Sequence, residues 1–176
     1  MKKLLVAVSR NYVIGVHNQL PWKKIPEDLN FFKLMTENHI VIMGYNTWVS
    51  IGRKPLPKRK NVVIGRGTPD LTNDTRIKHC PQLTKDYLRY LEDKYPYMDI
   101  CFMGGLSIYE EALENDWVDK LYMTRVDMEV NENENSIRKF NPSLLSFLEK
   151  EKDNYLCSHP YHCTVETYKR KRSNAA

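Results

Sequence analysis

Short apolar runs alternate along the chain with segments whose apolar residues recur at helical spacing. A short continuous apolar run is typical of a strand that is buried on both faces. This pattern predicts strands at residues 4–8, 39–43, 61–64, 76–78, 99–103 and 120–126. Residues 144–170 predict a final pair of strands, joined in a hairpin that turns near Ser158, His159 and Pro160.

Helices are predicted between these strands. Pro26, Glu27 and Asp28 are a typical helix start, because proline is favoured in the first turn and acids are stabilised there. Leu29 and Phe32 give this helix an apolar face, and further helices are predicted at 45–50, 83–91 and 107–113. The alternation predicts an α/β fold: a single domain with a mostly parallel, twisted central sheet of about eight strands, an antiparallel C-terminal hairpin and helices on both faces.

A long connection from Ser9 to Ile25 separates the first strand from the first helix. Structureless connections of more than about 12–15 residues are uncommon in compact domains and usually serve binding or catalysis. We therefore predict that residues 9–25 form a functional loop.

The composition is that of a folded protein whose excess charge lies at one end. Of 176 residues, 41% are hydrophobic and 28% are charged, which fits one domain, predicted at 1–170, and a basic tail at 171–176. Lys169 to Arg172 supply four of the five net positive charges, so we interpret them as a solvated end rather than a nucleic-acid patch. No apolar run approaches the ~20 residues of a membrane span. We expect a monomer that binds neither nucleic acid nor membrane.

The cysteines are too few for a disulfide framework, which predicts reduced thiols and a cytoplasmic protein. They are Cys80, Cys101, Cys157 and Cys163. His159 and His162 lie close to the last two in sequence, which suggests zinc as an alternative. Zinc ligand pairs are usually separated by about a dozen residues, and neighbours in a strand point to opposite faces, so we expect no metal.

Asp28 has two interpretations. On a helical first turn it can be a solvated acid that interacts with the helix dipole, as Glu27 can. In a pocket beside Leu29 and Phe32, desolvation would raise its pKa and let it take part in proton transfer near neutral pH. The helix pattern alone does not decide between the two.

Gly104 and Gly105 follow a predicted buried strand and precede a predicted helix. Glycine lets backbone amides approach an anion, and the helix N-terminus adds positive potential. The spacing is not that of the G-x-G-x-x-G fingerprint. A nucleotide site of another type and an ordinary strand-to-helix turn are therefore both compatible with these glycines.

The order of these motifs resembles the dihydrofolate reductase family over nearly the whole chain. The resemblance rests on VIG at 13–15, NQLPW at 18–22, PEDLNFFK at 26–33, VIMG at 41–44, TWVSIGR at 47–53, PLPKRKN at 55–61, MGG at 103–105, IY at 108–109 and LYMT at 121–124. It implies the family's activity, the NADPH-dependent reduction of dihydrofolate by hydride transfer to the pterin ring.

The resemblance also implies roles for single residues. Asp28 would hydrogen-bond the pterin and promote protonation of its imine nitrogen, with Thr124 supporting the carboxylate and Trp22 holding an ordered water. Arg59 would bind the α-carboxylate of the glutamate tail, a task that suits a guanidinium fork. The implied substrate-binding residues are Leu5, Asp28, Leu29, Phe32, Ile51, Leu56, Arg59 and Met103.

The implied cofactor is NADPH, and the segment 9–25 would be a lid over its nicotinamide. The residues implied to bind it are Ala7, Ile14, Gly15, Asn18, Leu20, Thr47, Arg66, Gly104, Gly105, Ser107, Ile108 and Tyr109.

The sequence departs from the family pattern in three places. Many members carry a basic residue after the glycine of the second strand, but Tyr45 follows Gly44 here, so Arg66 is predicted to bind the 2′-phosphate instead. Leu20 stands where bacterial members often have methionine. Residues 131–140 lack the usual pattern, so the resemblance does not predict that they support the lid.

Two other functions are compatible with this fold. A reductase of a riboflavin precursor usually lacks the acid on the helix, so Asp28 and Arg59 argue against it. A binding module that has lost catalysis, with a tail that recruits nucleic acid, need not keep Asp28, Thr124, Gly104 and Gly105 together.

Overall fold

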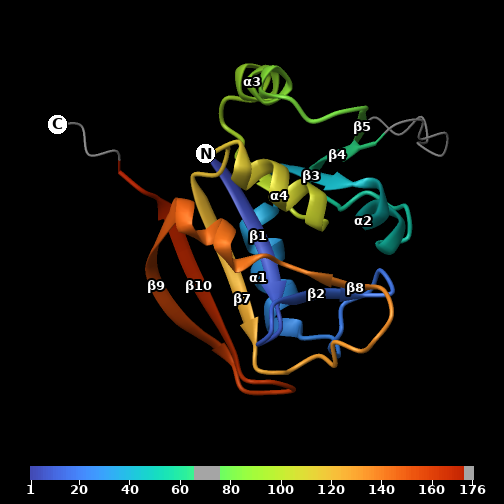
Figure 1. The fold of residues 1–176 in the computed structure, drawn as a ribbon. Coiled ribbons are helices and arrows are strands. Elements are labelled where there is room, and N and C mark those ends of the chain that lie inside the picture. Colours follow the sequence, from blue (N-terminus) through green and yellow to red (C-terminus); the bar gives the residue numbers. More distant parts are fainter. Residues whose placement is uncertain (66–75, 173–176) are drawn as a thin grey trace.

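The computed structural model describes residues 1–65 and 76–172, and its centre is a twisted sheet of eight strands (Figure 1). Their bounds are β1 Lys2–Val8, β3 Ile40–Gly44, β4 Lys60–Ile64, β5 Ile77–Cys80, β6 Ile100–Phe102, β7 Lys120–Val126, β9 Leu148–Cys157 and β10 Cys163–Arg170. They lie in the order β5-β4-β3-β6-β1-β7-β10-β9. The pairings among the first six are parallel, whereas β10 pairs antiparallel with β7 and β9. The predicted mostly parallel sheet and the C-terminal hairpin are confirmed.

Helices cover both faces of this sheet. Successive side chains of a strand point to opposite faces, so neighbouring residues of β1 pack against different helices. On one face, Leu4 and Val6 of β1 share a core cluster with buried residues of α3 (Lys85–Lys94) and α4 (Leu106–Glu114). On the other, Leu5 packs with Trp48 of α2 (Tyr45–Ser50) and with Phe32 of α1 (Pro26–Thr36). Figure 1 shows α4 and α1 on opposite sides of the sheet.

The predicted loop at 9–25 contains a strand that its sequence pattern did not predict. This strand, β2 (Val13–Val16), pairs antiparallel with β8 (Ile137–Lys139) in a separate two-stranded sheet. Both strands are short, and they lie more than a hundred residues apart in sequence. Periodicity within a short window therefore could not indicate the pairing.

The helix predicted at 83–91 begins two residues later, at Lys85. Thr84 is its N-cap: the Thr84 side chain accepts a hydrogen bond from the Tyr87 backbone N–H at 3.1 Å. Such a cap satisfies one of the free N–H groups of the first helical turn and thereby sets where the helix starts.

The C-terminal hairpin forms one edge of the large sheet. It follows a short 3-10 helix, η1 (Pro142–Phe147), and β10 ends at Arg170. Arg170 makes ion pairs with Asp116 and Asp119, and Lys169 pairs with Glu149. Two of the four basic residues at 169–172 thus belong to the sheet edge. None of the described helices is long and apolar enough to cross a membrane.

Candidate active site

Residues expected to bind ligands gather at the carboxyl ends of the parallel strands. Ala7 and Thr124 are register partners near the ends of β1 and β7, and Gly44 ends β3. Met103 directly follows β6, and its backbone N–H donates to the Ile42 carbonyl at 3.0 Å. In α/β sheets, ligands bind in the crevice beyond the carboxyl ends of the strands. The carboxyl-end side of the sheet is therefore the candidate active site.

Asp28 reaches this site from the first turn of α1, where its side chain is half-buried. The Thr124 hydroxyl on β7 donates a hydrogen bond to Asp28 Oδ1 at 2.7 Å. Burial raises the pKa of the Asp28 carboxyl because the loss of water disfavours charge, and the hydrogen bond from Thr124 opposes part of that rise. Glu27, one residue earlier, is exposed. Of the two acids, Asp28 has the surroundings of a pocket acid and Glu27 those of a solvated one.

An apolar wall lies on the same side of the sheet as α1. Its members are partly buried and pack against the core cluster that contains Leu5 and Trp48; they include Phe32, Ile51, Leu56 and Met103. The Leu5 carbonyl accepts a hydrogen bond from the Tyr109 hydroxyl at 2.8 Å. This bond connects a residue expected to contact the substrate with one expected to contact the cofactor. Leu29, by contrast, is 44% exposed.

Arg59 is held from two sides. Its Nε donates to Thr36 Oγ1 at 3.2 Å, and its Nη1 donates to the Pro57 carbonyl at 2.8 Å. Thr36 is fully buried in the last turn of α1 and itself donates to the Phe32 carbonyl at 2.8 Å. These bonds orient the guanidinium group, and within residues 1–65 and 76–172 its Nη2 makes no hydrogen bond.

Asn61, at the start of β4, shapes the loop that carries Leu56 and Arg59. The fully buried Asn61 side chain accepts from the Leu56 N–H at 2.9 Å and donates to the carbonyls of Leu56 and Arg59 at 3.1 and 3.2 Å. Neither this role of Asn61 nor that of Thr36 was predicted from the sequence. Asn61 was named only as the last residue of the stretch 55–61 that resembles the family. Its hydrogen-bond partners become evident only in the folded loop.

The two glycines after β6 let the backbone pass close to Tyr109 and Thr47 in front of α4. Gly104 has φ +118°, and a Cβ added there would lie 3.1 Å from the Tyr109 hydroxyl oxygen. A Cβ added at Gly105 would lie 3.5 Å from Thr47 Oγ1, and the Gly44 N–H donates to the Gly104 carbonyl at 2.8 Å. Glycine backbone at the positive end of a helix fits the close approach of a phosphate group.

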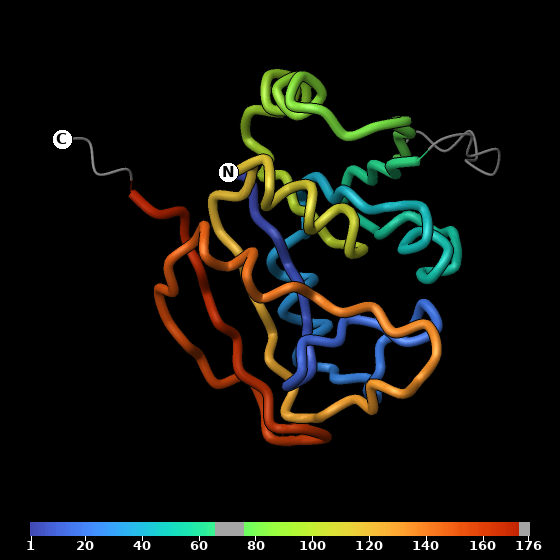
Figure 2. Tube along the Cα trace, viewed as in Figure 1, coloured from blue at the N-terminus to red at the C-terminus, as the bar shows by residue number. Residues whose placement is uncertain are grey.

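Residues 10–17, in the first half of the segment 9–25, are bound by residues 128–139. Besides the β2–β8 pairing, the Arg10 N–H donates to the Met128 carbonyl at 2.9 Å. The Asn11 side chain donates to the Val130 carbonyl at 2.8 Å and accepts from the Val130 N–H at 3.1 Å. Figure 2 shows the two segments side by side. Residues 131–140 therefore contact the expected lid, although they depart from the family pattern.

The other expected residues are distributed around this site. Gly15 is buried in β2, whereas Asn18 and Leu20 are exposed after it. Trp22 is buried in a small cluster against which Ala7 packs. The remaining placements are Ile14 against the main core, Ile108 buried in α4 and Ser107 exposed in its first turn. Arg66 lies outside the described residues.

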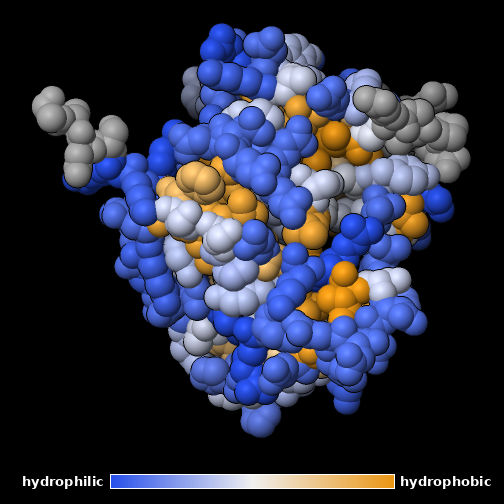
Figure 3. Space-filling view, in the orientation of Figure 1, coloured by the Kyte–Doolittle hydropathy of each residue, from blue (hydrophilic) through white to orange (hydrophobic). Residues whose placement is uncertain are grey.

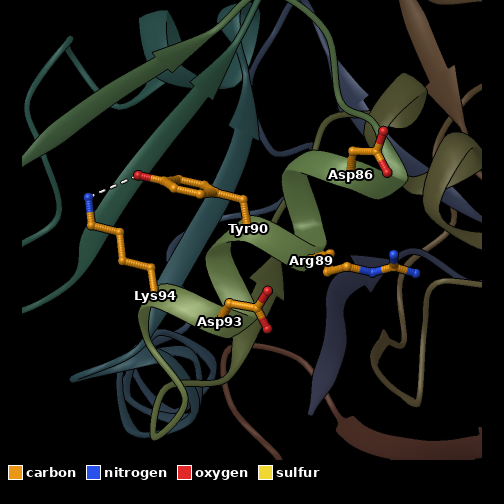
Figure 4. Close-up of a pocket in the computed structure, with 5 residues that line it drawn as sticks. All are labelled: Asp86, Arg89, Tyr90, Asp93 and Lys94. Atoms are coloured by element: carbon orange, nitrogen blue, oxygen red, sulfur yellow. Dashed lines mark hydrogen bonds between the residues drawn. The ribbon is translucent and has the colours of Figure 1, made fainter.

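Two hollows elsewhere in the molecule do not compete with this site. One is lined by Asp86, Arg89, Tyr90, Asp93 and Lys94, which all project from α3 (Figure 4). The other lies between α3 and the end of α4, and Lys2 at the amino end of β1 lines it. It therefore lies at the amino ends of the parallel strands, whereas Asp28 lies at their carboxyl ends.

On the face drawn in Figure 3, hydrophobic side chains reach the surface above β2 and β8, bordered by hydrophilic ones.

In the described part of the chain, the fold brings no third ligand to the zinc alternative. Cys157 and Cys163 are cross-strand partners, but nowhere in residues 1–65 and 76–172 do three or more His, Cys, Asp or Glu side chains gather in a metal-binding arrangement.

Comparison with known proteins matches the whole of this architecture. The sequence profile of the family described as "Dihydrofolate reductase" matches residues 1–170. The dihydrofolate reductase of Bacillus subtilis is 32% identical over 177 aligned residues, covering 100% of this chain and 98% of its own. That of Buchnera aphidicola from Acyrthosiphon pisum is 39% identical over 128 residues, covering 72% and 73%. The structure of dihydrofolate reductase from Enterococcus faecalis, complexed with NADP(H) and RAB-propyl, superposes with a TM-score of 0.77 at 25% identity, covering 98% of this chain and 97% of that one.

Proposed function

The chain belongs to the dihydrofolate reductase family, whose members reduce dihydrofolate to tetrahydrofolate with NADPH, and we propose that Asp28 promotes the protonation which this reduction requires. The enzyme is an oxidoreductase, and the reacting group of its substrate is the imine of the pterin ring. The observation that carries the proposal is the half-buried Asp28 carboxyl with its 2.7 Å hydrogen bond from Thr124.

The chemistry explains why an acid is needed at this place. Addition of a hydride to an imine carbon leaves negative charge on the nitrogen unless that nitrogen is protonated. A carboxyl whose pKa is raised by burial holds its proton closer to neutral pH than a solvated aspartate does. Asp28 is thus suited to hydrogen-bond the pterin and favour its protonated form. Thr124 keeps the carboxyl in one orientation, and we assign Trp22 to hold a water beside it.

The residues of this chain fit NADPH. The glycine backbone at Gly104 and Gly105, in front of α4, fits the pyrophosphate, and Thr47 lines the same place. Tyr109 and the segment 9–25 would lie against the nicotinamide end, and Arg66 would bind the 2′-phosphate. When bound, NADPH supplies the hydride, and the protein supplies position and electrostatics.

The rest of dihydrofolate would extend along the apolar wall towards Arg59. Ile51 and Leu56 offer partly buried apolar surface for the benzoyl group. Arg59 is held by Thr36 and Pro57 in one orientation, which prepares its remaining N–H groups for a carboxylate. We propose that it binds the α-carboxylate of the glutamate tail.

We also propose that the enzyme is a cytoplasmic monomer that binds no nucleic acid. All four cysteines are free thiols, which supports a reducing compartment. Sedimentation at assay concentration tests the oligomeric state.

An assay of NADPH consumption tests the function. We expect oxidation of NADPH that depends on dihydrofolate, with no oxidation when a pyrimidine precursor of riboflavin replaces it. Consumption with the riboflavin precursor alone would identify the other reductase, and binding of dihydrofolate without turnover would identify a non-catalytic binding module.

A further inference from the structure

Two cysteines face each other at the end of the β9–β10 hairpin. Cys157 and Cys163 are register partners, and their side chains are only 6% and 0% exposed. Directly opposite residues of an antiparallel pair have Cα atoms about 4.5–5.5 Å apart. A disulfide requires Cα atoms about 4.4–6.8 Å apart. The pairing of these two residues therefore fits the separation that a disulfide needs.

The two sulfur atoms also lie against the same oxygen. Sγ of Cys157 is 3.6 Å and Sγ of Cys163 is 3.5 Å from the Tyr161 carbonyl oxygen, so both thiols point to one place inside the turn. The chain's other cysteines are not arranged in this way. Cys80 is on β5 and Cys101 is on β6, and two other strands separate them in the sheet.

The pair contacts the end of the segment 9–25. Both cysteines belong to the small buried cluster that contains Trp22 and Ile25, which lie just before α1 and Asp28. Tyr161, whose carbonyl accepts from both thiols, also accepts a hydrogen bond through its hydroxyl from the Lys23 N–H at 3.3 Å. A bond between the two sulfurs would therefore change the packing around Trp22 and Ile25, at the end of the expected lid.

We propose that Cys157 and Cys163 form an oxidisable dithiol site, which closes to an intramolecular disulfide when the protein meets a small disulfide oxidant such as oxidised glutathione. Cys157 is the residue that reacts first. It is slightly the more exposed of the two, and it ends β9, the edge strand of the sheet, whose middle residues are exposed to solvent. Opening of such an edge costs less than opening of the core.

The reaction balances with one oxidant molecule. Cys157 loses its thiol proton, and its sulfur attacks one sulfur of oxidised glutathione, which forms a mixed disulfide and releases one glutathione thiolate. Cys163 then loses its proton and attacks the Cys157 sulfur, which releases the second glutathione. Two protein thiols are oxidised, one glutathione disulfide is reduced to two thiols, and the two protons pass to the glutathione sulfurs. Burial raises the pKa of Cys163 to about 12, so closure is slow until the turn opens.

Peptide mapping of the full, folded chain tests the proposal. The reduced protein is incubated with oxidised glutathione, the remaining thiols are alkylated in denaturant, and the digest is analysed by mass spectrometry. We expect two of the four cysteines to be protected, with a linked peptide that contains Cys157 and Cys163 at least about tenfold enriched over any other pair. Dithiothreitol should restore all four thiols.

Matched variants separate this site from ordinary thiol oxidation. Cys157→Ser and Cys163→Ser should each abolish the linked peptide, whereas Cys101→Ser, at a cysteine that is equally buried, should keep it. The wild-type map decides the question even where a serine variant fails to fold. A stable glutathione adduct on Cys157 without closure would overturn the proposal. So would four unmodified thiols at oxidant levels that fully oxidise a free dithiol.

Discussion

The Thr124 hydroxyl donates its hydrogen bond to Asp28 across 96 residues of sequence, from the end of β7 to the first turn of α1. Two opposite effects act on this carboxyl. Burial raises its pKa, and the hydrogen bond from Thr124 lowers it. Hydrogen bonds to the charged form of an acid favour that form, and desolvation disfavours it. The balance between these two effects sets the pH range in which the Asp28 carboxyl holds its proton.

The first prediction concerns the acid itself. Asp28→Asn keeps the shape of the side chain but cannot take part in proton transfer, so kcat at neutral pH should fall by roughly 10²–10⁴-fold. The loss should shrink as pH falls, because solvent then protonates the pterin. Steady-state turnover measured as a function of pH checks both expectations. Turnover close to that of the wild type at neutral pH would contradict the role of Asp28.

The stability of the same variant shows whether its loss of activity is chemical. Because folding raises the pKa of Asp28 above 3.8, the folded state binds this proton more tightly than the unfolded state does. The free energy of unfolding therefore falls as pH rises from the unfolded-state pKa through the folded-state one. Asparagine stays neutral, so the variant should be at least as stable as the wild type at pH 7. A lower melting temperature would mean that the activity loss is partly structural.

The second prediction isolates the hydrogen bond. Thr124→Val removes the donor, so the pKa of Asp28 should rise further, and its ionisation in the pH profile of kcat/KM should move to higher pH. Loss of this hydrogen bond to a half-buried group should also reduce the free energy of unfolding by about 0.5–1.5 kcal/mol. Thr124→Ser retains the hydroxyl and is the matched control. Identical pH profiles for the valine and serine variants would show that the bond does not tune Asp28.

The third prediction concerns the loop that carries Arg59. Asn61→Ala leaves backbone groups of Leu56 and Arg59 without their buried partner. We expect the free energy of unfolding to fall by about 1–3 kcal/mol and the KM for dihydrofolate to rise about tenfold. A dihydropterin that lacks the glutamate tail is the control, because its KM should change little. Equal increases for both substrates would show that Asn61 does not act through Arg59.

The fourth prediction concerns the choice of cofactor. No basic residue follows Gly44, so we expect Arg66 to provide most of the preference for NADPH. Arg66→Ala should raise the KM for NADPH about tenfold or more and leave that for NADH almost unchanged, because only NADPH carries the 2′-phosphate. Parallel titrations with the two cofactors check this. Equal losses for both would assign Arg66 another role.

The fifth prediction concerns the basic tail. Lys169 and Arg170 are ion-paired at the sheet edge, so a deletion that begins at residue 171 spares them. Removal of 171–176 should leave turnover within about twofold of the full chain, because chain ends outside the sheet contribute little to folding. The intact protein should not retain a labelled oligonucleotide at physiological salt. Retention that falls steeply with salt, and is lost on truncation, would reveal a nucleic-acid site.

The sequence alone predicted the elements that depend on local pattern. The buried runs of β1, β3 and β7, the start of α1 at Pro26 and the hairpin at the C-terminus are each evident within a short window. Burial of apolar surface drives folding, so its periodicity is visible before any tertiary contact is known. The resemblance to a family supplied the residues expected at the site, and the glycines after β6 suggested a phosphate site; these assignments stay predictions.

The tertiary structure decided what depends on residues far apart in sequence. The hydrogen bond from Thr124 distinguishes the surroundings of Asp28 from those of a solvated acid. The buried amide of Asn61 sets the shape of the loop that carries Arg59. The β2–β8 pairing and the facing thiols of Cys157 and Cys163 likewise depend on backbone register. Hydrogen bonds and desolvation act over a few ångströms, and only the folded chain brings these groups within that distance.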